Sequence, residues 1–305
     1  MHERLLTRFR PPASTRPRLR GAATGVRVRW LGTAGHVLEG ARTTLLIDPF
    51  VSRPSPLRVL LAPLESDPAA IARHVPSRVD GVLVGHSHFD HLLDAPAIAL
   101  RAGAKLVGSR TTSAFGRAAG LTEAQLVEVP PEGATAEIGD ARVTFVPSLH
   151  ARLALGRVPF AGEVASPPRL PARAHRYRMG GAFGLLVELD GVRIYHNGSA
   201  DLVDAEVAGL RADVALVGLA GRRATARYLP RLLGALTPSV VVPTHHDSFF
   251  APLEAGARLL PGVDFGGFLS DVAELAPGAR VLAPGYDDVM VVGAGAARDA
   301  ALWDR

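Results

Sequence analysis

The stretch His86-Ser87-His88-Phe89-Asp90-His91 contains four side chains that can bind a metal ion within six positions. The apolar run Gly81-Val82-Leu83-Val84 precedes it and predicts a buried strand. The four side chains therefore follow a strand end, where alternation places His86 and His88 on one side of the chain. Imidazoles and a carboxylate at this spacing suit a borderline or hard divalent ion such as zinc, manganese or iron. The alternative is a polar, histidine-rich surface loop, which does not explain why the cluster follows a buried strand.

The composition is that of a globular protein. The 305 residues are 48% hydrophobic and 21% charged, so the chain can bury a sizeable core. Cysteine is absent, which excludes disulfides, thiolate metal sites and cysteine nucleophiles. Residues 1–20 lack the apolar segment of a secretory signal, and no apolar run is long enough to cross a membrane. We therefore expect a cytoplasmic protein, and the oligomeric state leaves no readable pattern in the sequence.

The positive charge is concentrated at the N-terminus. Residues 1–30 contain eight arginines and one acidic residue, a net charge of +7, whereas the whole chain carries +5. Residues 31–305 are therefore slightly acidic, which makes nucleic acid an unlikely partner. We expect residues 1–25 to form a flexible basic arm, or a tail laid on the surface, and residues 26–305 to form a single domain. Such an arm could contact anionic lipid or nucleic acid.

Polar residues recur where predicted strands end. Besides 81–84, hydrophobic patterning predicts strands over 26–31, 36–39, 43–47, 105–108, 125–129, 134–138, 141–146, 182–189, 192–195, 214–219, 240–242, 279–283 and 289–292. Helices are predicted over 67–74, 95–102, 111–119, 223–236 and 267–275. His150, the turn 196–201 and the group 245–247 each follow one of these strands. The four groups together indicate a site on one rim of a sheet assembly, although a lone histidine such as His196 is expected to be structural.

The motif His86-x-His88-x-Asp90-His91 resembles the signature of metallo-β-lactamase-fold hydrolases. The order agrees as well, because a lone histidine, a glycine-containing turn and a final histidine follow the motif. The segment from Trp30-Leu31-Gly32 to Asp48-Pro49, and Pro243-x-His245, resemble the branch that holds N-acyl-phosphatidylethanolamine phospholipase D and ascorbate-6-phosphate lactonase. The resemblance covers about residues 27–292. It implies an α/β fold, a four-layer αββα sandwich.

The same resemblance implies two metal-binding groups, three histidines in one and an aspartate with two histidines in the other: His86, His88 and His150, and Asp90, His91 and His245. Ser199 stands where the family has a bridging aspartate, so Asp201, two residues later, is a further candidate ligand. The alternative is one firmly bound ion and one weakly bound ion. We expect one or two zinc ions, with manganese or iron as alternatives, and a catalytic role for Asp90 in orienting the attacking water.

The segment 151–180 is expected to cover the site. It is rich in proline and arginine and directly follows His150, and loops of this length usually carry function. His175 within it, and His246 beside His245, are candidate substrate-binding residues. The arginines fit an anionic small-molecule substrate, and they equally fit a solvated loop.

These features predict a hydrolase in which metal-bound hydroxide attacks a phosphodiester, lactone or related ester, because a divalent ion lowers the pKa of bound water toward about 7. No Gly-x-Ser-x-Gly elbow indicates a serine nucleophile. Three alternatives stay open: an iron-dependent redox enzyme on the same fold, a nuclease, and a non-catalytic metal-binding homologue. The absence of a flavin-binding domain argues against the redox enzyme, and the slightly acidic charge of residues 31–305 argues against the nuclease. The otherwise complete ligand pattern argues against the non-catalytic homologue.

Overall fold

The computed structural model describes residues 8–15, 25–153, 156–286, 288–293 and 301–303. Its larger sheet has the strand order β17-β16-β1-β2-β3-β5-β6-β7. The strands of this sheet are β1 (Val26–Gly32), β2 (Gly35–Glu39), β3 (Thr44–Ile47), β5 (Gly81–Leu83), β6 (Lys105–Gly108), β7 (Leu126–Glu128), β16 (Val289–Val292) and β17 (Ala301–Trp303).

The second sheet has the order β15-β14-β13-β12-β11-β9-β8. Its strands are β8 (Ala134–Ile138), β9 (Ala141–Pro147), β11 (Phe183–Leu189), β12 (Val192–Asn197), β13 (Val214–Gly218), β14 (Val240–Thr244) and β15 (Arg280–Val281). Two short strands, β4 (Pro63–Leu64) and β10 (Ala172–Arg173), pair separately. The helices are α1 (Pro56–Leu61), α2 (Pro68–His74), α3 (Phe89–Leu92), α4 (Ala95–Ala102), α5 (Arg110–Ala118), α6 (Asp204–Val207), α7 (Tyr228–Leu236) and α8 (Phe265–Leu275).

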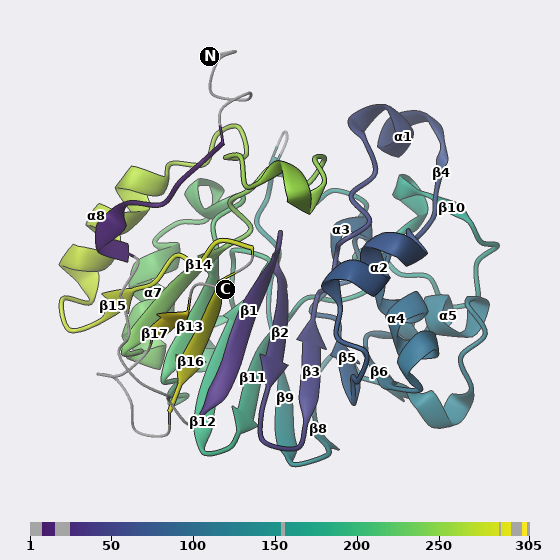
Figure 1. Ribbon diagram of the computed structural model, residues 1–305, viewed down its shortest axis with the longest axis horizontal. Helices are drawn as coiled ribbons and strands as arrows, with labels where there is room; N and C mark the ends of the chain where they lie inside the picture. Colours follow the sequence, from purple (N-terminus) through teal and green to yellow (C-terminus); the bar gives the residue numbers. More distant parts are fainter. Residues whose placement is uncertain (1–7, 16–24, 154–155, 287, 294–300, 304–305) are drawn as a thin grey trace.

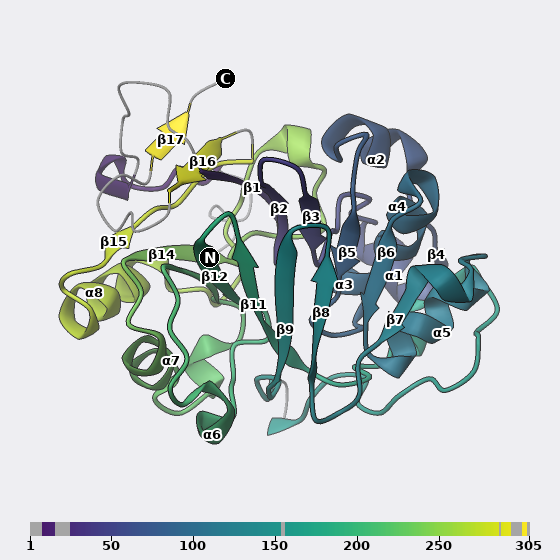
Figure 2. The ribbon, with the colours of Figure 1, turned by 90° about the horizontal axis from the view of Figure 1, so that it is seen from below.

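The two sheets lie between outer layers of helices, which makes four layers (Figures 1 and 2). Three clusters of buried hydrophobic side chains hold these layers together. One core fills the space between the two sheets and includes Leu83 and Leu185. A second core, which includes Phe115, packs helices such as α4 and α5 onto the larger sheet. The third, which includes Phe268, packs α7 and α8 onto the other sheet. The expected αββα sandwich is confirmed.

The parallel strands explain why the polar groups meet. In the larger sheet β3, β5, β6 and β7 run parallel, and in the other sheet β12, β13 and β14 do so. The carboxyl ends of parallel strands lie at one edge of a sheet, where polar loop residues can face each other across the sandwich. β13 and β14 are buried along their whole length because both faces are covered.

Several local expectations are corrected. No helix or strand is predicted from the sequence between residues 51 and 66, and this segment contains α1. The helix expected over 223–236 begins instead at Tyr228, so that Pro230 falls in its first turn, where a missing N–H is tolerated. Asp94 occupies the N-cap position of α4 but makes no capping hydrogen bond with its side chain, which instead accepts from the Val51 and Ser52 amides at 2.7 and 2.8 Å.

The described part of the N-terminal arm lies against the domain. The Phe9 amide donates to the Ala257 carbonyl at 2.6 Å, and the Thr15 carbonyl accepts the Ala283 amide at 3.2 Å. Residues 1–7 and 16–24 of the expected flexible arm lie outside the described residues. Within the described ranges, no helix has both the length and the apolar character needed to span a membrane.

Candidate metal centre

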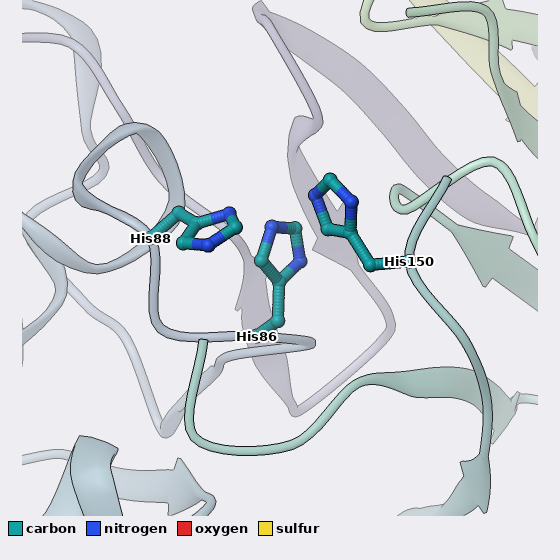
Figure 3. A group of neighbouring side chains, drawn as sticks. All are labelled: His86, His88 and His150. Carbon is teal, nitrogen blue, oxygen red and sulfur yellow. The ribbon is translucent and has the colours of Figure 1, made fainter. Parts of the chain in front are cut away.

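Three histidine rings converge at the edge where the β5 and β9 strands end (Figure 3). His86 and His88 come from the loop between β5 and α3, and His150 follows β9. The ring centroids of His86 and His88 lie 4.8 Å apart, and those of both residues lie 4.9 Å from His150. One nitrogen from each ring lies within 4.8 Å of the others, which is close enough to surround a single ion.

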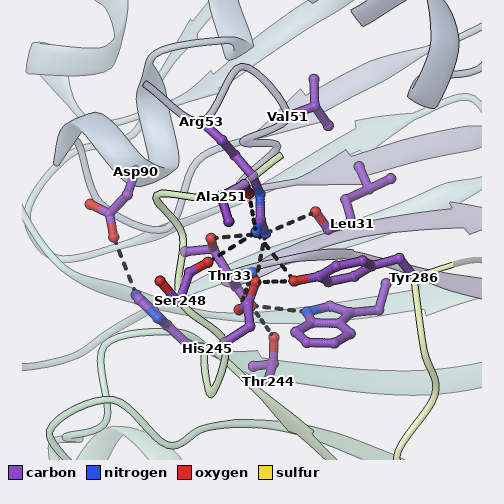
Figure 4. A network of polar contacts seen from close by, with 12 residues as sticks. Leu31, Thr33, Val51, Arg53, Asp90, Thr244, His245, Ser248, Ala251 and Tyr286 are labelled. Carbon is purple, nitrogen blue, oxygen red and sulfur yellow. Dashed lines mark hydrogen bonds and ion pairs between the residues drawn. The ribbon is translucent and has the colours of Figure 1, made fainter. Parts of the chain in front are cut away.

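A second group of three side chains adjoins the first. Asp90 Oδ2 lies 3.3 Å from His245 Nε2 and 3.6 Å from His91 Nε2, and Figure 4 shows the contact of Asp90 with His245. His91 and His86 bring the two groups together, with ring centroids 3.8 Å apart. The sequence expectation of two neighbouring ligand groups therefore matches the geometry of these six residues.

Hydrogen bonds outside the groups determine which ring nitrogens remain free. Nε2 of His88 donates to the Pro159 carbonyl and Nδ1 of His150 to the Ala151 carbonyl, each at 2.8 Å. These nitrogens must carry the protons, because a carbonyl oxygen can only accept. His88 Nδ1 and His150 Nε2 are then left as lone-pair donors. Such partners typically orient metal-binding histidines and fix their tautomers.

Asp48 performs the same role for His91 and was not identified from the sequence. Its Oδ2 accepts from His91 Nδ1 at 2.8 Å, and its Oδ1 accepts from the Gly85 amide at 2.7 Å. Asp48 is fully buried, so the carboxylate holds the ring with Nε2 directed at Asp90. The only signal in the sequence was its position at a strand end, in Ile47-Asp48-Pro49.

The donor chemistry fits divalent cations. Buried polar atoms nearly always have partners, yet among the described residues His86 Nε2 has none. Burial lowers the pKa of His86 well below its usual value and that of His88 to about 4, so both rings are neutral ligands at pH 7. Burial would raise the pKa of Asp90, but His91 and His245 outweigh burial and keep it well below its usual range.

His245 is held in a conformation that L-residues rarely adopt, with φ +52°. Its amide donates to the Thr33 carbonyl at 2.7 Å, and that carbonyl also accepts from the Thr244 hydroxyl at 2.7 Å. The Thr33 amide donates to Asp247 Oδ1 at 2.8 Å, and Asp247 Oδ2 accepts from Arg53 Nη2 at 2.7 Å. This network, shown in Figure 4, ties the loop after β14 to the β1–β2 turn.

The structure does not bring Asp201 to either ligand group. Its carboxylate accepts from the Leu202 amide at 2.8 Å and lies 3.4 Å from Arg231 Nη1. Ser199, at the position expected for a bridging carboxylate, donates its hydroxyl to the Leu149 carbonyl at 2.8 Å. Among the described residues, Asp90 is the only carboxylate in the two groups. The local turn thus directs Asp201 away from the metal centre.

The two predicted substrate-binding histidines also lie elsewhere. His175 is exposed in a short 3-10 helix and lines a surface cavity together with Arg173 and Arg176. His246 is buried against Trp30, with their rings stacked 4.5 Å apart, and it lines a different cavity from the one over the ligand groups. His196 is structural, as expected, since its Nε2 bonds to the Ala34 carbonyl at 3.0 Å.

A cavity of about 190 Å³ lies over the two ligand groups. Its walls are mostly apolar, and no arginine or lysine lines it among the described residues. Segment 151–180 contributes Leu153, Pro159 and Phe160, and the loop after β14 contributes Phe249 and Leu260. Phe160 adopts φ +42°, and its ring lies edge-on to His88 with centroids 6.3 Å apart.

Comparison with known proteins agrees with this geometry. A family model described as a β-lactamase superfamily domain matches residues 43–248. A UPF0173 metal-dependent hydrolase of Archaeoglobus fulgidus is 30% identical over 238 residues, which cover 73% of this chain and 84% of that protein.

Two solved structures share the fold. Igni18, a metallo hydrolase from Ignicoccus hospitalis, matches with a TM-score of 0.57 and 21% identity, covering 92% of this chain and 100% of its own. CmlA, a diiron β-hydroxylase from Streptomyces venezuelae, matches with a TM-score of 0.52 and 18% identity, covering 87% of this chain and 54% of its own.

Proposed function

Because the chain belongs to the β-lactamase superfamily and is a metal-dependent hydrolase, we propose that it binds two divalent ions and hydrolyses an ester. The single observation that carries the proposal is the pair of adjoining ligand groups, with one histidine nitrogen or carboxylate oxygen offered by each of six residues. Zinc is the proposed metal, since nitrogen and oxygen donors of this kind suit it, and manganese or iron are the alternatives. A cytoplasmic location stays a prediction.

Divalent ions in such a site supply a water nucleophile that is ionised near neutral pH. Asp90 is the proposed catalytic residue, because its carboxylate lies between His91 and His245 and faces the cavity over both groups. The carboxylate remains ionised, so it can accept a hydrogen bond from the attacking water and orient it. Pro159 and Asp48 keep the histidine tautomers constant during this reaction.

The cavity walls favour a substrate with an apolar substituent. Leu153, Phe160, Phe249 and Leu260 offer contact surface and no charge, and arginines of segment 151–180 such as Arg173 and Arg176 line another cavity. We therefore propose that the scissile group, a lactone, related ester or phosphodiester, is bound by the metals while its apolar part packs against these walls. The arginines of segment 151–180 had suggested an anionic substrate, but the residues that line the cavity over the two ligand groups do not support this.

The proposal is tested by metal analysis of the purified protein and by hydrolysis assays on three model substrates. We propose an alkyl-substituted γ-lactone, the same lactone with a carboxylate on its alkyl chain, and bis(p-nitrophenyl) phosphate. Of the two lactones, the one without the carboxylate on its alkyl chain should have the higher kcat/KM. Phe160→Arg should reverse that preference, whereas Asp140→Asn, a change at an exposed hairpin turn, should not alter it. Protein that binds no metal and stays inert after reconstitution with zinc, manganese and iron would contradict the proposal.

The alternatives make different predictions in the same experiments. A redox enzyme on this fold would purify with iron and consume oxygen. A nuclease would need a cationic approach to the centre, and none of the described cavity residues provides it. A non-catalytic homologue would bind metal without turnover and would gain activity only on a change such as Ser199→Asp.

A further inference from the structure

A second cavity, of about 350 Å³, is lined by His246 but by none of the six ligand-forming residues. Its walls come from the N-terminal segment 8–11, from Trp30 at the end of β1, and from the chain around Tyr286. The sequence had suggested a substrate role for His246 because it adjoins His245. The structure instead separates the two neighbours, so that each lines its own cavity.

His246 belongs to an aromatic wall of this cavity. The residue is 1% exposed, and both ring nitrogens are buried. Its ring stacks on Trp30 at 4.5 Å with an interplanar angle of 21°, and Phe9 and Phe265 contact it at 5.8 and 5.2 Å between centroids. His246 therefore adds ring surface to the cavity rather than an accessible polar atom.

The charged residues that line this cavity are two arginines and two acidic residues. Arg8 and Arg10 line it, and among the described residues neither has an acidic partner. Arg8 packs over Gly256, where any larger side chain would collide with its guanidinium. The two acidic residues of the lining are already engaged. Glu254 is paired with Arg73 and His74, and Asp288 accepts from the Gly285 amide at 2.6 Å.

We propose that this cavity is a binding site for a small, ring-bearing monoanion of the aromatic carboxylate type. Its ring would pack beside Phe9, Trp30 and Tyr286, and its anionic group would face Arg8 and Arg10. Aromatic walls recognise a flat ring, and the guanidinium fork matches a carboxylate. The site is independent of the proposed reaction, because it shares no residue with the cavity over the ligand groups.

The test is calorimetric titration of the metal-loaded 305-residue protein with 2-naphthoate, with neutral 2-naphthamide as the matched probe. We expect measurable binding of 2-naphthoate, weakened about tenfold or more by the double change Arg8→Gln and Arg10→Gln, because charge-assisted hydrogen bonds are lost. The matched double change Arg173→Gln and Arg176→Gln, at exposed arginines of another cavity, should leave the affinity unchanged. 2-Naphthamide should bind more weakly than 2-naphthoate and be insensitive to the Arg8 and Arg10 changes.

A second measurement locates the bound probe. The chain has two tryptophans, so Trp303→Phe leaves Trp30 as the only indole. 2-Naphthoate should quench Trp30 emission in this variant, and the Arg8 and Arg10 changes should shift the quenching curve to higher concentration. The proposal is overturned if 2-naphthoate does not bind. It is also overturned if 2-naphthoate binds but its affinity does not respond to the Arg8 and Arg10 changes and Trp30 emission is not quenched, a result that would indicate binding of the carboxylate at the candidate metal centre instead.

Discussion

The carboxylate of Asp48 joins Nδ1 of His91, at 2.8 Å, to the amide of Gly85, at 2.7 Å. One buried residue at the end of β3 therefore orients a ligand ring and holds the backbone that leads into the ligand loop. The pKa of His91 reflects the same contact. Burial would lower this pKa, but Asp48 and Asp90 outweigh burial and raise it.

Asp48→Asn should weaken metal binding by about 10–100-fold, because partners of metal-binding histidines contribute on this scale. The affinity should decrease at the group formed by Asp90, His91 and His245. In a competition titration with a zinc chelator, the ion bound by this group should therefore be released first. Asp80→Asn is the matched control. Asp80 accepts from the Thr44 amide at 2.8 Å at the opposite end of the same strand pair, and its change should not alter metal stoichiometry. Equal affinity for both ions in Asp48→Asn would contradict the assigned role.

The carboxylates of Asp90 and Asp201 can be distinguished directly. Asp90→Asn should release one ion and reduce kcat by at least about 100-fold, as expected for loss of a group that orients the attacking water. Asp201→Asn should keep both ions and most of the activity, since Asp201 contacts Arg231 and the Leu202 amide and neither ligand group. Elemental analysis and steady-state kinetics of the two variants check this. Loss of an ion from Asp201→Asn would restore it as a ligand.

The buried pair of Arg53 and Asp247 should make stability depend on pH. Burial would raise the pKa of Asp247, but Arg53, His246 and Tyr286 outweigh burial and hold it below its usual value. A carboxylate with a lowered pKa in the folded state contributes stability above its unfolded pKa of about 3.9, and the contribution is lost as pH falls through the lower folded value. Asp247→Asn should therefore lower the free energy of unfolding by about 3–5 kcal/mol at neutral pH, because Arg53 is left unpaired.

This difference between the native protein and Asp247→Asn should be constant above about pH 4 and should shrink below it. Urea unfolding of both proteins, measured with a chelator present between pH 3 and pH 7, separates the effect from metal release. Asp140→Asn serves as the exposed control, since Asp140 pairs with Arg42 at the surface and should contribute little at any pH. A difference that grows toward low pH would show that the sign is wrong.

Metal removal should destabilise the folded protein. His86 Nε2 is buried without a partner among the described residues, and the two ligand groups assemble only in the folded chain. A ligand that binds only the native state at 100 times its Kd adds about 2.7 kcal/mol of stability. Chelation should lower Tm, and added zinc should restore it. The same treatment of a His86→Ala and His245→Ala double variant should change Tm much less.

The sequence by itself determined the site's local chemistry. Six residues after a buried strand contain four candidate metal ligands, and the recurrence of polar groups at strand ends predicted that His150 and His245 belong to the same site. The αββα architecture was expected from the resemblance of this motif and its order to a known family, and not from the apolar pattern alone. The buried strand and the cluster after it involve residues that are close together in the chain, so the pattern of residue types is enough to recognise them.

Tertiary structure decided everything that depends on the direction of a side chain. The Asp201 carboxylate contacts Arg231, 30 positions away. The His246 ring stacks on Trp30, and the Asp48 carboxylate accepts a hydrogen bond from His91. His245 is directed at Asp90 because its backbone is held at φ +52° by the Thr33 carbonyl, contributed by a turn more than 200 residues earlier. The local chain allows several orientations of each of these side chains, and contacts with segments distant in the sequence decide which one is adopted. The order of residue types along the chain does not reveal these contacts, so the orientations could not be predicted from it.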